Sequence, residues 1–323
     1  MVFRLGEPVT ARQFKVSWMA VVAASAFGAA WQATPAHAAS LETVATLARG
    51  RAALESLALD RDGSFYMTSN FPHEIWQISA RGEVLRKIDV GFATQVVVLS
   101  PDGRQLIVTG HDRLPVFTGS IETMQMTGLG TRVAVVDKAS GKVLQSVAGP
   151  EDAFFNGLAL LRAGRYLIAD SIGGSLWVFD AGHGRVERWL SDESIEGSGG
   201  KPHFGGSNGL KVRGHYAYFT SRGSMWRVAI GGGAEAVGKP LRFAAIGGDD
   251  FDIARDGSIY IPGNNALMKV SPDGRTIGKV IDIGVAAPTA MLSKDQRSVY
   301  LLTRGMRASD GGEPESKLLL IRL

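Results

Sequence analysis

The chain consists largely of short runs in which apolar and polar residues alternate, separated by tight turns that contain glycine. The clearest example begins at Asn156, continues through an alternating apolar segment to a turn at Gly164, and ends in a second apolar segment up to Ser171. Alternation with a period of two residues is typical of half-buried strands, and glycine favours a tight hairpin between them. We therefore predict an antiparallel strand–turn–strand unit at this position.

The same unit returns at intervals of about 40 to 60 residues along the whole chain. In five of the six copies, a reference residue stands eight positions before the residue at the turn, and in the remaining copy the turn comes two residues sooner. The six reference residues are Glu55, Gln95, Asn156, Asn208, Asp249 and Pro288. A repeat of this length indicates a solenoid or a propeller. Up to four strands of about five residues in each unit match the size of a propeller blade.

The sixth unit is incomplete, because the pattern shows only three strands, at Met291–Leu292, Ser298–Leu302 and Lys317–Leu323. A spare strand at Thr43–Ala48 precedes the first unit and can complete this sheet. Such closure leaves no open sheet edge between the first and the last blade. We predict an all-β, six-bladed β-propeller that comprises residues 39–323 and is closed by an N-terminal strand. In the fourth unit the pattern also predicts only three strands.

The first 38 residues have the features of a secretory signal peptide. Arg12 and Lys15 form a positive region, Val16 to Ala30 is apolar and uncharged, and Ala36-His37-Ala38 has the small-x-small pattern of a cleavage site. The apolar segment is shorter than the roughly 20 residues that a membrane-spanning helix needs. No arginine pair is present, which favours the Sec route. We expect cleavage after Ala38 and a periplasmic or secreted protein without membrane association.

Composition excludes several classes of function. The chain contains no cysteine, so it has no disulfide, no thiolate metal ligand and no cysteine nucleophile. Removal of the leader charges lowers the formal net charge from +4 to about +2, and no cluster of lysine and arginine indicates nucleic-acid binding. There is no Gly-x-Ser-x-Gly nucleophile elbow between a strand and a helix, so a serine hydrolase is not indicated. We expect a monomer that acts on a small molecule.

Two insertions interrupt the repeat, one from His111 to Gly130 and the other from Ser191 to Gly206. Long loops on a regular scaffold carry function in some proteins and are merely solvated in others, and the sequence leaves both open. The histidines lack metal-ligand spacing. His203, shortly before Asn208, is the histidine expected nearest to a channel mouth and is a candidate for substrate contact.

In a propeller the first strand of each blade lines the central channel, so the six reference residues are expected at similar depth. Four of them carry oxygen donors, namely Glu55, Asn156, Asn208 and Asp249. Such hard ligands favour Ca²⁺, Mg²⁺ or Mn²⁺ over zinc or copper. The alternatives stay open at this point: an Asn-Gly pair is often only a turn, and an isolated carboxylate is often solvated or caps a backbone amide.

Four segments resemble the SMP-30/gluconolactonase/luciferin-regenerating-enzyme-like family of six-bladed propellers, which is related to diisopropyl fluorophosphatase. They are L-E-S-L-A-L around Glu55, N-G-L-A-L with Y-L-I-A-D-S after Asn156, S-N-G-L around Asn208, and D-I-A-R-D-G-S-I-Y-I after Asp249. The resemblance implies that Glu55, Asn156, Asn208 and Asp249 hold a divalent cation, most often Ca²⁺, and that Asp249 is also the catalytic residue.

The chain departs from the family pattern at two of these positions. The family usually has Glu-Gly-Pro at the first site and Pro-Asp-Gly at the last, whereas this chain has Glu55-Ser56-Leu57 and Gly248-Asp249-Asp250. The last ligand is therefore Asp249 or Asp250.

The resemblance implies hydrolysis of a lactone or a related cyclic or aryl ester, with the cation as Lewis acid and the aspartate as general base or nucleophile. Hydrolysis of phosphotriesters at the same metal is a second interpretation. The main alternative is an exported propeller that binds a protein, a peptide or a glycan and catalyses nothing, because propellers serve many roles.

Overall fold

The structure is a computed structural model of the 323-residue chain. It describes residues 39–49, 54–69, 73–113, 128–196, 205–263, 265–303 and 315–323, which all belong to one compact unit. The predicted signal peptide, residues 114–127 of the first insertion and residues 197–204 of the second, with His203, lie outside this part of the chain. The described residues contain no helix long and apolar enough to cross a membrane.

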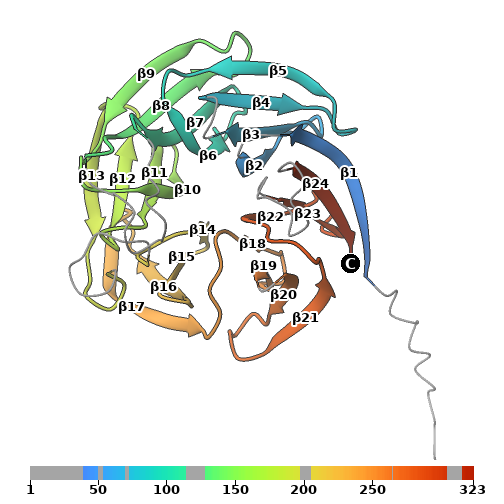
Figure 1. Cartoon of the computed structure of the whole chain (residues 1–323). Helices are drawn as coiled ribbons and strands as arrows, with labels where there is room; N and C mark the ends of the chain where they lie inside the picture. Colours follow the sequence, from blue (N-terminus) through green and yellow to red (C-terminus); the bar gives the residue numbers. More distant parts are fainter. Residues whose placement is uncertain are drawn as a thin grey trace, which may run out of the picture. The chain divides into compact units, whose positions relative to one another are not determined.

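The described residues form six four-stranded antiparallel sheets in a ring, the blades of a six-bladed β-propeller (Figure 1). Blade 1 contains β2 (Leu54–Leu59), β3 (Phe65–Ser69), β4 (Glu74–Ile78) and β5 (Val84–Asp89). Blade 2 contains β6 (Ala93–Leu99), β7 (Gln105–His111), β8 (Thr131–Asp137) and β9 (Val143–Ala148). Blade 3 contains β10 (Phe155–Arg162), β11 (Arg165–Asp170), β12 (Leu176–Asp180) and β13 (Arg185–Leu190).

The second half of the ring repeats this order. Blade 4 contains β14 (Leu210–Arg213), β15 (Tyr216–Ser221), β16 (Ser224–Ile230) and β17 (Ala236–Ala244). Blade 5 contains β18 (Asp252–Ile253), β19 (Ile259–Gly263), β20 (Ala266–Val270) and β21 (Ile277–Asp282). Blade 6 contains β22 (Thr289–Leu292), β23 (Ser298–Leu302), β24 (Glu315–Arg322) and, as its outermost strand, β1 (Ser40–Arg49).

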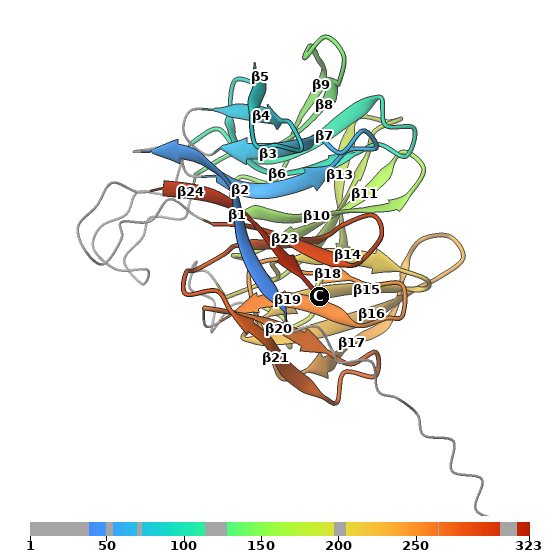
Figure 2. The ribbon, with the colours of Figure 1, turned by 90° about the vertical axis from the view of Figure 1, so that its right-hand side faces the viewer.

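The ring is closed by the N-terminal strand, as predicted. Strand β1 pairs antiparallel with β24, from Ser40 opposite Arg322 to Arg49 opposite Glu315. The two strands lie side by side in both ribbon views, β1 in blue and β24 in red (Figures 1 and 2). Blade 6 therefore joins the two ends of the described chain within one sheet.

The first hairpin of each blade has the predicted turn. Gly63, Gly103, Gly164, Gly214 and Gly257 all have positive φ, between 56° and 92°. Gln296 takes the same place in blade 6 with a φ of 62°, although it is not glycine. A positive φ is unfavourable for residues with a side chain, so the shared value confirms the repeat register in the one blade that lacks the glycine.

The hydrophobic core lies between neighbouring blades. Six buried clusters each join residues of two adjacent sheets, and together they cover all six blade interfaces, including the one between blades 6 and 1. In blade 3, for example, the buried Phe155 packs with Val133 and Ile107 of blade 2. Each strand alternates its side chains between two such clusters, which explains why the inner strands are buried on both faces.

The three-strand prediction for the fourth unit was wrong, because β17 completes this blade. Gly238 and Pro240 interrupt its apolar pattern, and the register with β16 shifts between Arg227 and Ala229. Gly238 has a φ of 73° at this irregularity. Proline lacks an N–H group and is tolerated on an outermost strand, so the strand persists without the sequence signal of a strand.

Candidate functional site

The four oxygen-bearing residues predicted from the repeat lie around one small pocket at the centre of the ring. Glu55, Asn156, Asn208 and Asp249 all line a cavity of about 20 Å³, together with Asp250 and residues next to them. Glu55 and Asn156 are buried, with exposed fractions of 6% and 9%. A cavity of this size holds about one water molecule or one ion.

The inner strands position these residues in different ways. Glu55 lies in β2 and Asn156 in β10, whereas Asn208 and Asp249 stand just before β14 and β18. Neighbouring blades are joined by backbone bonds at this level. The Gly209 N–H donates to the Asp249 carbonyl at 2.7 Å, and the Asp250 N–H donates to the Pro288 carbonyl at 2.9 Å. These bonds hold blades 4, 5 and 6 in register around the pocket.

The glycine after each asparagine serves close packing rather than a turn. Neither Gly157 nor Gly209 has positive φ. A Cβ atom on Gly157 would lie 2.5 Å from the Asn208 carbonyl oxygen, and one on Gly209 would lie 2.5 Å from that of Asp249. Only glycine lets the inner strands of blades 3, 4 and 5 approach each other this closely. The glycine of each Asn-Gly pair is therefore explained by the close approach of neighbouring inner strands at the channel centre.

Two hydrogen bonds connect the polar side chains in pairs. Asn208 Nδ2 donates to Asp249 Oδ1 at 2.6 Å, across the interface between blades 4 and 5. Gln95 Nε2 donates to Asn156 Oδ1 at 3.1 Å, across the interface between blades 2 and 3. The Gln95–Asn156 bond is buried and the Asn208–Asp249 bond is partly buried, and both restrict the orientation of the side chains that they join.

Gln95 and Pro288, the other two reference residues, differ in their relation to the pocket. Pro288 lines the pocket. Gln95 does not line it, but its side chain donates a hydrogen bond to Asn156, which does. The Gln95 carbonyl accepts a hydrogen bond from Thr68 Oγ1 at 2.8 Å. Its side-chain Oε1 is buried and has no hydrogen-bond partner among the described residues. The sequence placed Gln95 at the right depth but did not reveal that it orients Asn156.

Asp249 and Asp250 differ in their contacts, although both line the pocket. Asp250 Oδ1 accepts from Lys211 Nζ at 2.6 Å, and its Oδ2 accepts from Thr289 Oγ1 at 3.0 Å. Asp249 contacts Asn208 instead. The oxygens of Asp250 thus accept from a lysine and a threonine, whereas Asp249 accepts from the carboxamide of Asn208 in the neighbouring blade.

The donor set suits a hard divalent cation. Among the described residues, no three His, Cys, Asp or Glu side chains gather in a metal-binding cluster. A cation at the pocket would therefore depend on the two carboxamides as well as on the two carboxylates. The Asn208 carboxamide donates to Asp249 through Nδ2, so its Oδ1 is the atom that can serve as a metal ligand. Two carboxylates and two amide oxygens fit Ca²⁺ or Mg²⁺, with water completing the coordination.

The described histidines do not contribute to this pocket. His111 is fully buried, accepts a hydrogen bond from the Phe155 N–H at 3.1 Å, and stacks on Phe154 with ring centroids 4.0 Å apart. Burial lowers the pKa of His111 to about 3, so its ring is neutral. His183 is exposed and pairs with Asp180.

Comparisons with known proteins add the following findings. No protein-family model and no curated protein sequence matches the chain significantly. Many solved structures match, among them a gluconolactonase from Xanthomonas campestris with 15% identity, covering 88% of this chain and 90% of that chain at a TM-score of 0.62. A luciferin-regenerating enzyme has 10% identity, with coverage of 88% and 95% and a TM-score of 0.64. A calcium-binding protein, regucalcin, from Agrobacterium tumefaciens has 15% identity, with coverage of 86% and 92% and a TM-score of 0.62.

The names of these structural neighbours point to the same family that the four sequence segments resemble. At 10–15% identity the likeness establishes the fold and no particular residue. The chain thus shares the six-bladed propeller of the SMP-30/gluconolactonase family.

Proposed function

We propose that the protein is a divalent-metal-dependent hydrolase that acts on a lactone or a related cyclic or aryl ester. The observation that carries the proposal is the convergence of Glu55, Asn156, Asn208 and Asp249, from four different blades, on one pocket of about 20 Å³. The gluconolactonase and regucalcin among the structural neighbours support it at the level of the fold.

In this proposal the four side chains hold one cation, with Ca²⁺ as the first candidate. When bound, a divalent cation polarises the ester carbonyl as a Lewis acid and stabilises negative charge on its oxygen. The pairing of Glu55 and Asp249 with two neutral carboxamides leaves a formal charge near −2, which such a cation would balance.

Asp249 is the proposed catalytic residue. As a general base, its carboxylate would take a proton from the attacking water and pass it to the leaving oxygen as the ester C–O bond breaks. As a nucleophile, it would displace that oxygen to form a mixed anhydride, which water would then hydrolyse to the acid and the free carboxylate. Asn208 donates to Asp249 Oδ1 at 2.6 Å and would keep the carboxylate oriented toward the pocket. Asp250 is held by Lys211 and Thr289 and would act only in shaping the site.

The test is a hydrolysis assay with a panel of lactones, aryl esters and organophosphates, each with and without a chelator. The proposal predicts chelator-sensitive turnover of a lactone or an aryl ester. It also predicts that Asp249→Asn lowers kcat by about 10²- to 10⁴-fold, the usual contribution of a general base. Asp250→Asn is the matched control and should retain far more activity. Chelator-resistant turnover, or an Asp249→Asn variant as active as the wild type, would contradict the proposal.

We also propose that residues 1–38 direct export through the Sec route. The charge distribution, the apolar segment and the Ala36-His37-Ala38 motif support this. Mass spectrometry of the protein recovered from expressing cells tests it, with Ala39 as the expected first residue. A protein that keeps its leader in the cytoplasmic fraction would refute the export proposal.

A further inference from the structure

A second and much larger cavity occupies the channel on the side of the first hairpin turns. Its volume is about 840 Å³, and every residue that lines it belongs to the described part of the chain. It shares Ser56, Val96, Leu158 and Asp250 with the small polar pocket, so the two cavities meet at this level of the channel. A volume of this size lies in the range of cavities that bind small organic ligands.

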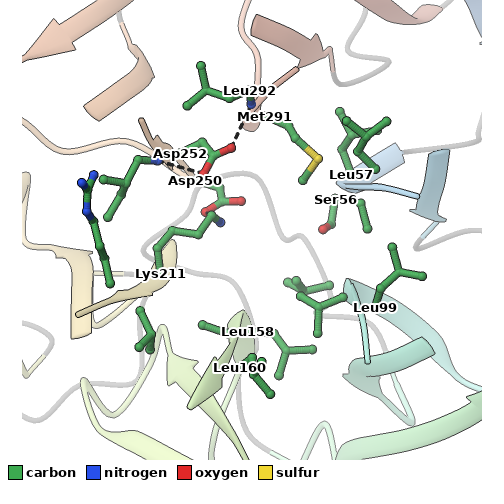
Figure 3. A pocket seen from close by; sticks show the side chains of 18 of the residues that line it. Ser56, Leu57, Leu99, Leu158, Leu160, Lys211, Asp250, Asp252, Met291 and Leu292 are labelled. Carbon is green, nitrogen blue, oxygen red and sulfur yellow. Dashed lines mark hydrogen bonds and ion pairs between the residues drawn. The ribbon is translucent and has the colours of Figure 1, made fainter. Parts of the chain in front are cut away.

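Every blade contributes an apolar side chain to the wall of this cavity. Each of the six inner strands contributes a large aliphatic or thioether side chain, namely Leu59, Leu99, Leu160, Val212, Ile253 and Met291. Figure 3 shows several of these apolar side chains around the opening. Leu160 is 36% exposed although it lies on an inner strand, β10. Binding of an apolar ligand to these side chains is favourable, because it removes apolar surface from water.

The acidic groups of the cavity are already satisfied. Asp250 is paired with Lys211 at 2.6 Å. Asp252 accepts hydrogen bonds from the Leu292 N–H and from the Ile253 N–H, both at 2.8 Å. Figure 3 shows Lys211, Asp250 and Asp252 grouped on one side of the cavity. Lys211 balances one of these two carboxylates and backbone N–H groups bind the other, so this side of the cavity offers no unpaired cation to an anionic ligand.

Two arginines at the turn end are not compensated in this way. Arg213 is the last residue of β14 and donates to the carbonyls of Ala254 and Arg255. Arg255 donates to the Lys294 carbonyl at 2.8 Å. Both line the cavity and bind backbone carbonyls rather than a carboxylate, although Asp256 lies near enough for Arg213 to help lower the pKa of its carboxyl. Their bonds to turn carbonyls hold the guanidinium groups in place and leave further N–H donors for an anion.

We propose that this turn-end channel binds a single long-chain carboxylate, with its alkyl chain against the six apolar side chains and its carboxylate on Arg213 and Arg255. The aliphatic wall suits the chain, and two fixed guanidinium groups at the turn end suit the carboxylate. This binding site is separate from the proposed hydrolytic reaction, because the residues that select the ligand are not those proposed to hold the cation.

The experiment is a calorimetric titration of the purified protein with palmitate below its micellar concentration, and with hexadecanol as the uncharged molecule of equal chain length. We expect palmitate to bind with one site per chain and at least tenfold more tightly than hexadecanol, because charge-assisted hydrogen bonds are the stronger class. Equal affinities for the two ligands, or no binding of palmitate, would overturn the proposal.

Variants separate the two halves of the site. Arg213→Gln combined with Arg255→Gln should weaken palmitate binding about tenfold or more and leave hexadecanol binding unchanged. Arg275→Gln is the matched control, because Arg275 is exposed, pairs with Asp273 and does not line the cavity. Leu160→Glu should weaken binding of both ligands, since it places a charge on the apolar wall. Thermal melting of each variant checks the fold.

Two further outcomes are decisive. If the double arginine variant binds palmitate as tightly as the wild type, the carboxylate does not sit on these arginines and the proposal fails. If the protein binds vesicles that contain anionic lipid but not monomeric palmitate, the basic groups serve a membrane surface and the proposal also fails. Palmitate binding that is lost in the double variant and retained in Arg275→Gln supports it.

Discussion

Asn208 and Asp249 are joined by a hydrogen bond of 2.6 Å between Nδ2 and Oδ1, although 41 residues separate them in the chain. The bond spans the interface between blades 4 and 5, where the Gly209 N–H also donates to the Asp249 carbonyl. Because Asp249 is the proposed catalytic residue, this contact links the packing of two blades to the chemistry of the pocket.

Replacement of this donor by an acid tests the contact. Asn208→Asp places two carboxylates at hydrogen-bond distance, and their repulsion should lower the free energy of unfolding by about 1–3 kcal/mol in metal-free protein. Excess Ca²⁺ should recover much of this loss, because a cation between the two groups would relieve the repulsion. The measurement is urea denaturation with and without Ca²⁺. Equal destabilisation under both conditions would show that no cation binds between these side chains.

Gln95 is expected to act through Asn156, which it contacts at 3.1 Å. Gln95→Leu removes the donor that fixes the Asn156 carboxamide, and metal affinity should fall about 10- to 100-fold, as for other residues that orient a ligand. The measurement is the Kd for Ca²⁺ by calorimetry. Gln77→Leu, on β4 and outside the pocket, is the control. An unchanged Kd in Gln95→Leu would show that Asn156 needs no such support.

The two glycines behind the asparagines should not tolerate alanine. In Gly157→Ala or Gly209→Ala, the new Cβ atom would lie 2.5 Å from a carbonyl oxygen of the next blade. Backbone cannot move aside as easily as a side chain, so we expect a loss of about 1–3 kcal/mol in the free energy of unfolding. Gly278→Ala is the control, because its new methyl group would have nothing within 4 Å and its φ is not positive. Similar stabilities for all three variants would contradict the close approach of the inner strands.

His111 should make the stability of the fold sensitive to mild acid. Burial lowers its pKa from 6.5 to about 3, so the unfolded chain binds a proton at a pH at which the folded chain does not. The contribution of the neutral His111 ring to the free energy of unfolding is complete above pH 6.5 and is lost progressively as the pH falls toward 3. Between pH 7 and pH 5 the loss amounts to about 2 kcal/mol.

The comparison variant is His111→Gln, whose amide oxygen can still accept the Phe155 N–H. It should be less stable than the wild type at neutral pH but should show a shallower loss of stability between pH 7 and pH 5 by about 2 kcal/mol. Chemical denaturation at both pH values measures the difference. Parallel pH profiles for the two proteins would mean that His111 does not remain neutral in the folded chain.

The fold could be predicted from the sequence because most copies of the repeat contain the same short-range features, namely a turn glycine and alternating apolar residues. Turn glycines such as Gly63 and Gly164 mark the first hairpin of a blade, and the alternating pattern marks its strands. Strand β17 was missed because Gly238 and Pro240 remove the local pattern, while pairing with β16 still holds the segment extended. Tertiary contacts can therefore maintain a strand that local propensity does not indicate.

The candidate site could be predicted in part, for a related reason. A shared offset from the turn identified Glu55, Asn156 and Asp249, and the motif around Asn208 added the fourth residue. The offset could not distinguish a residue that lines the pocket from one that supports it, as Gln95 shows. The Lys211–Asp250 pair was not predicted either, because side-chain partners from different blades leave no common spacing in the sequence.

The most direct test of the proposed metal centre is the metal content and Ca²⁺ affinity of the purified protein, compared with those of Glu55→Gln. Glu55 is 6% exposed and lines the small pocket with the other three proposed ligands. We predict one divalent cation per chain in the wild type and a loss of affinity of at least about 100-fold in the variant, with the fold retained. A wild-type protein that binds no divalent cation, or a Glu55→Gln variant that binds it equally well, would contradict the proposed metal centre.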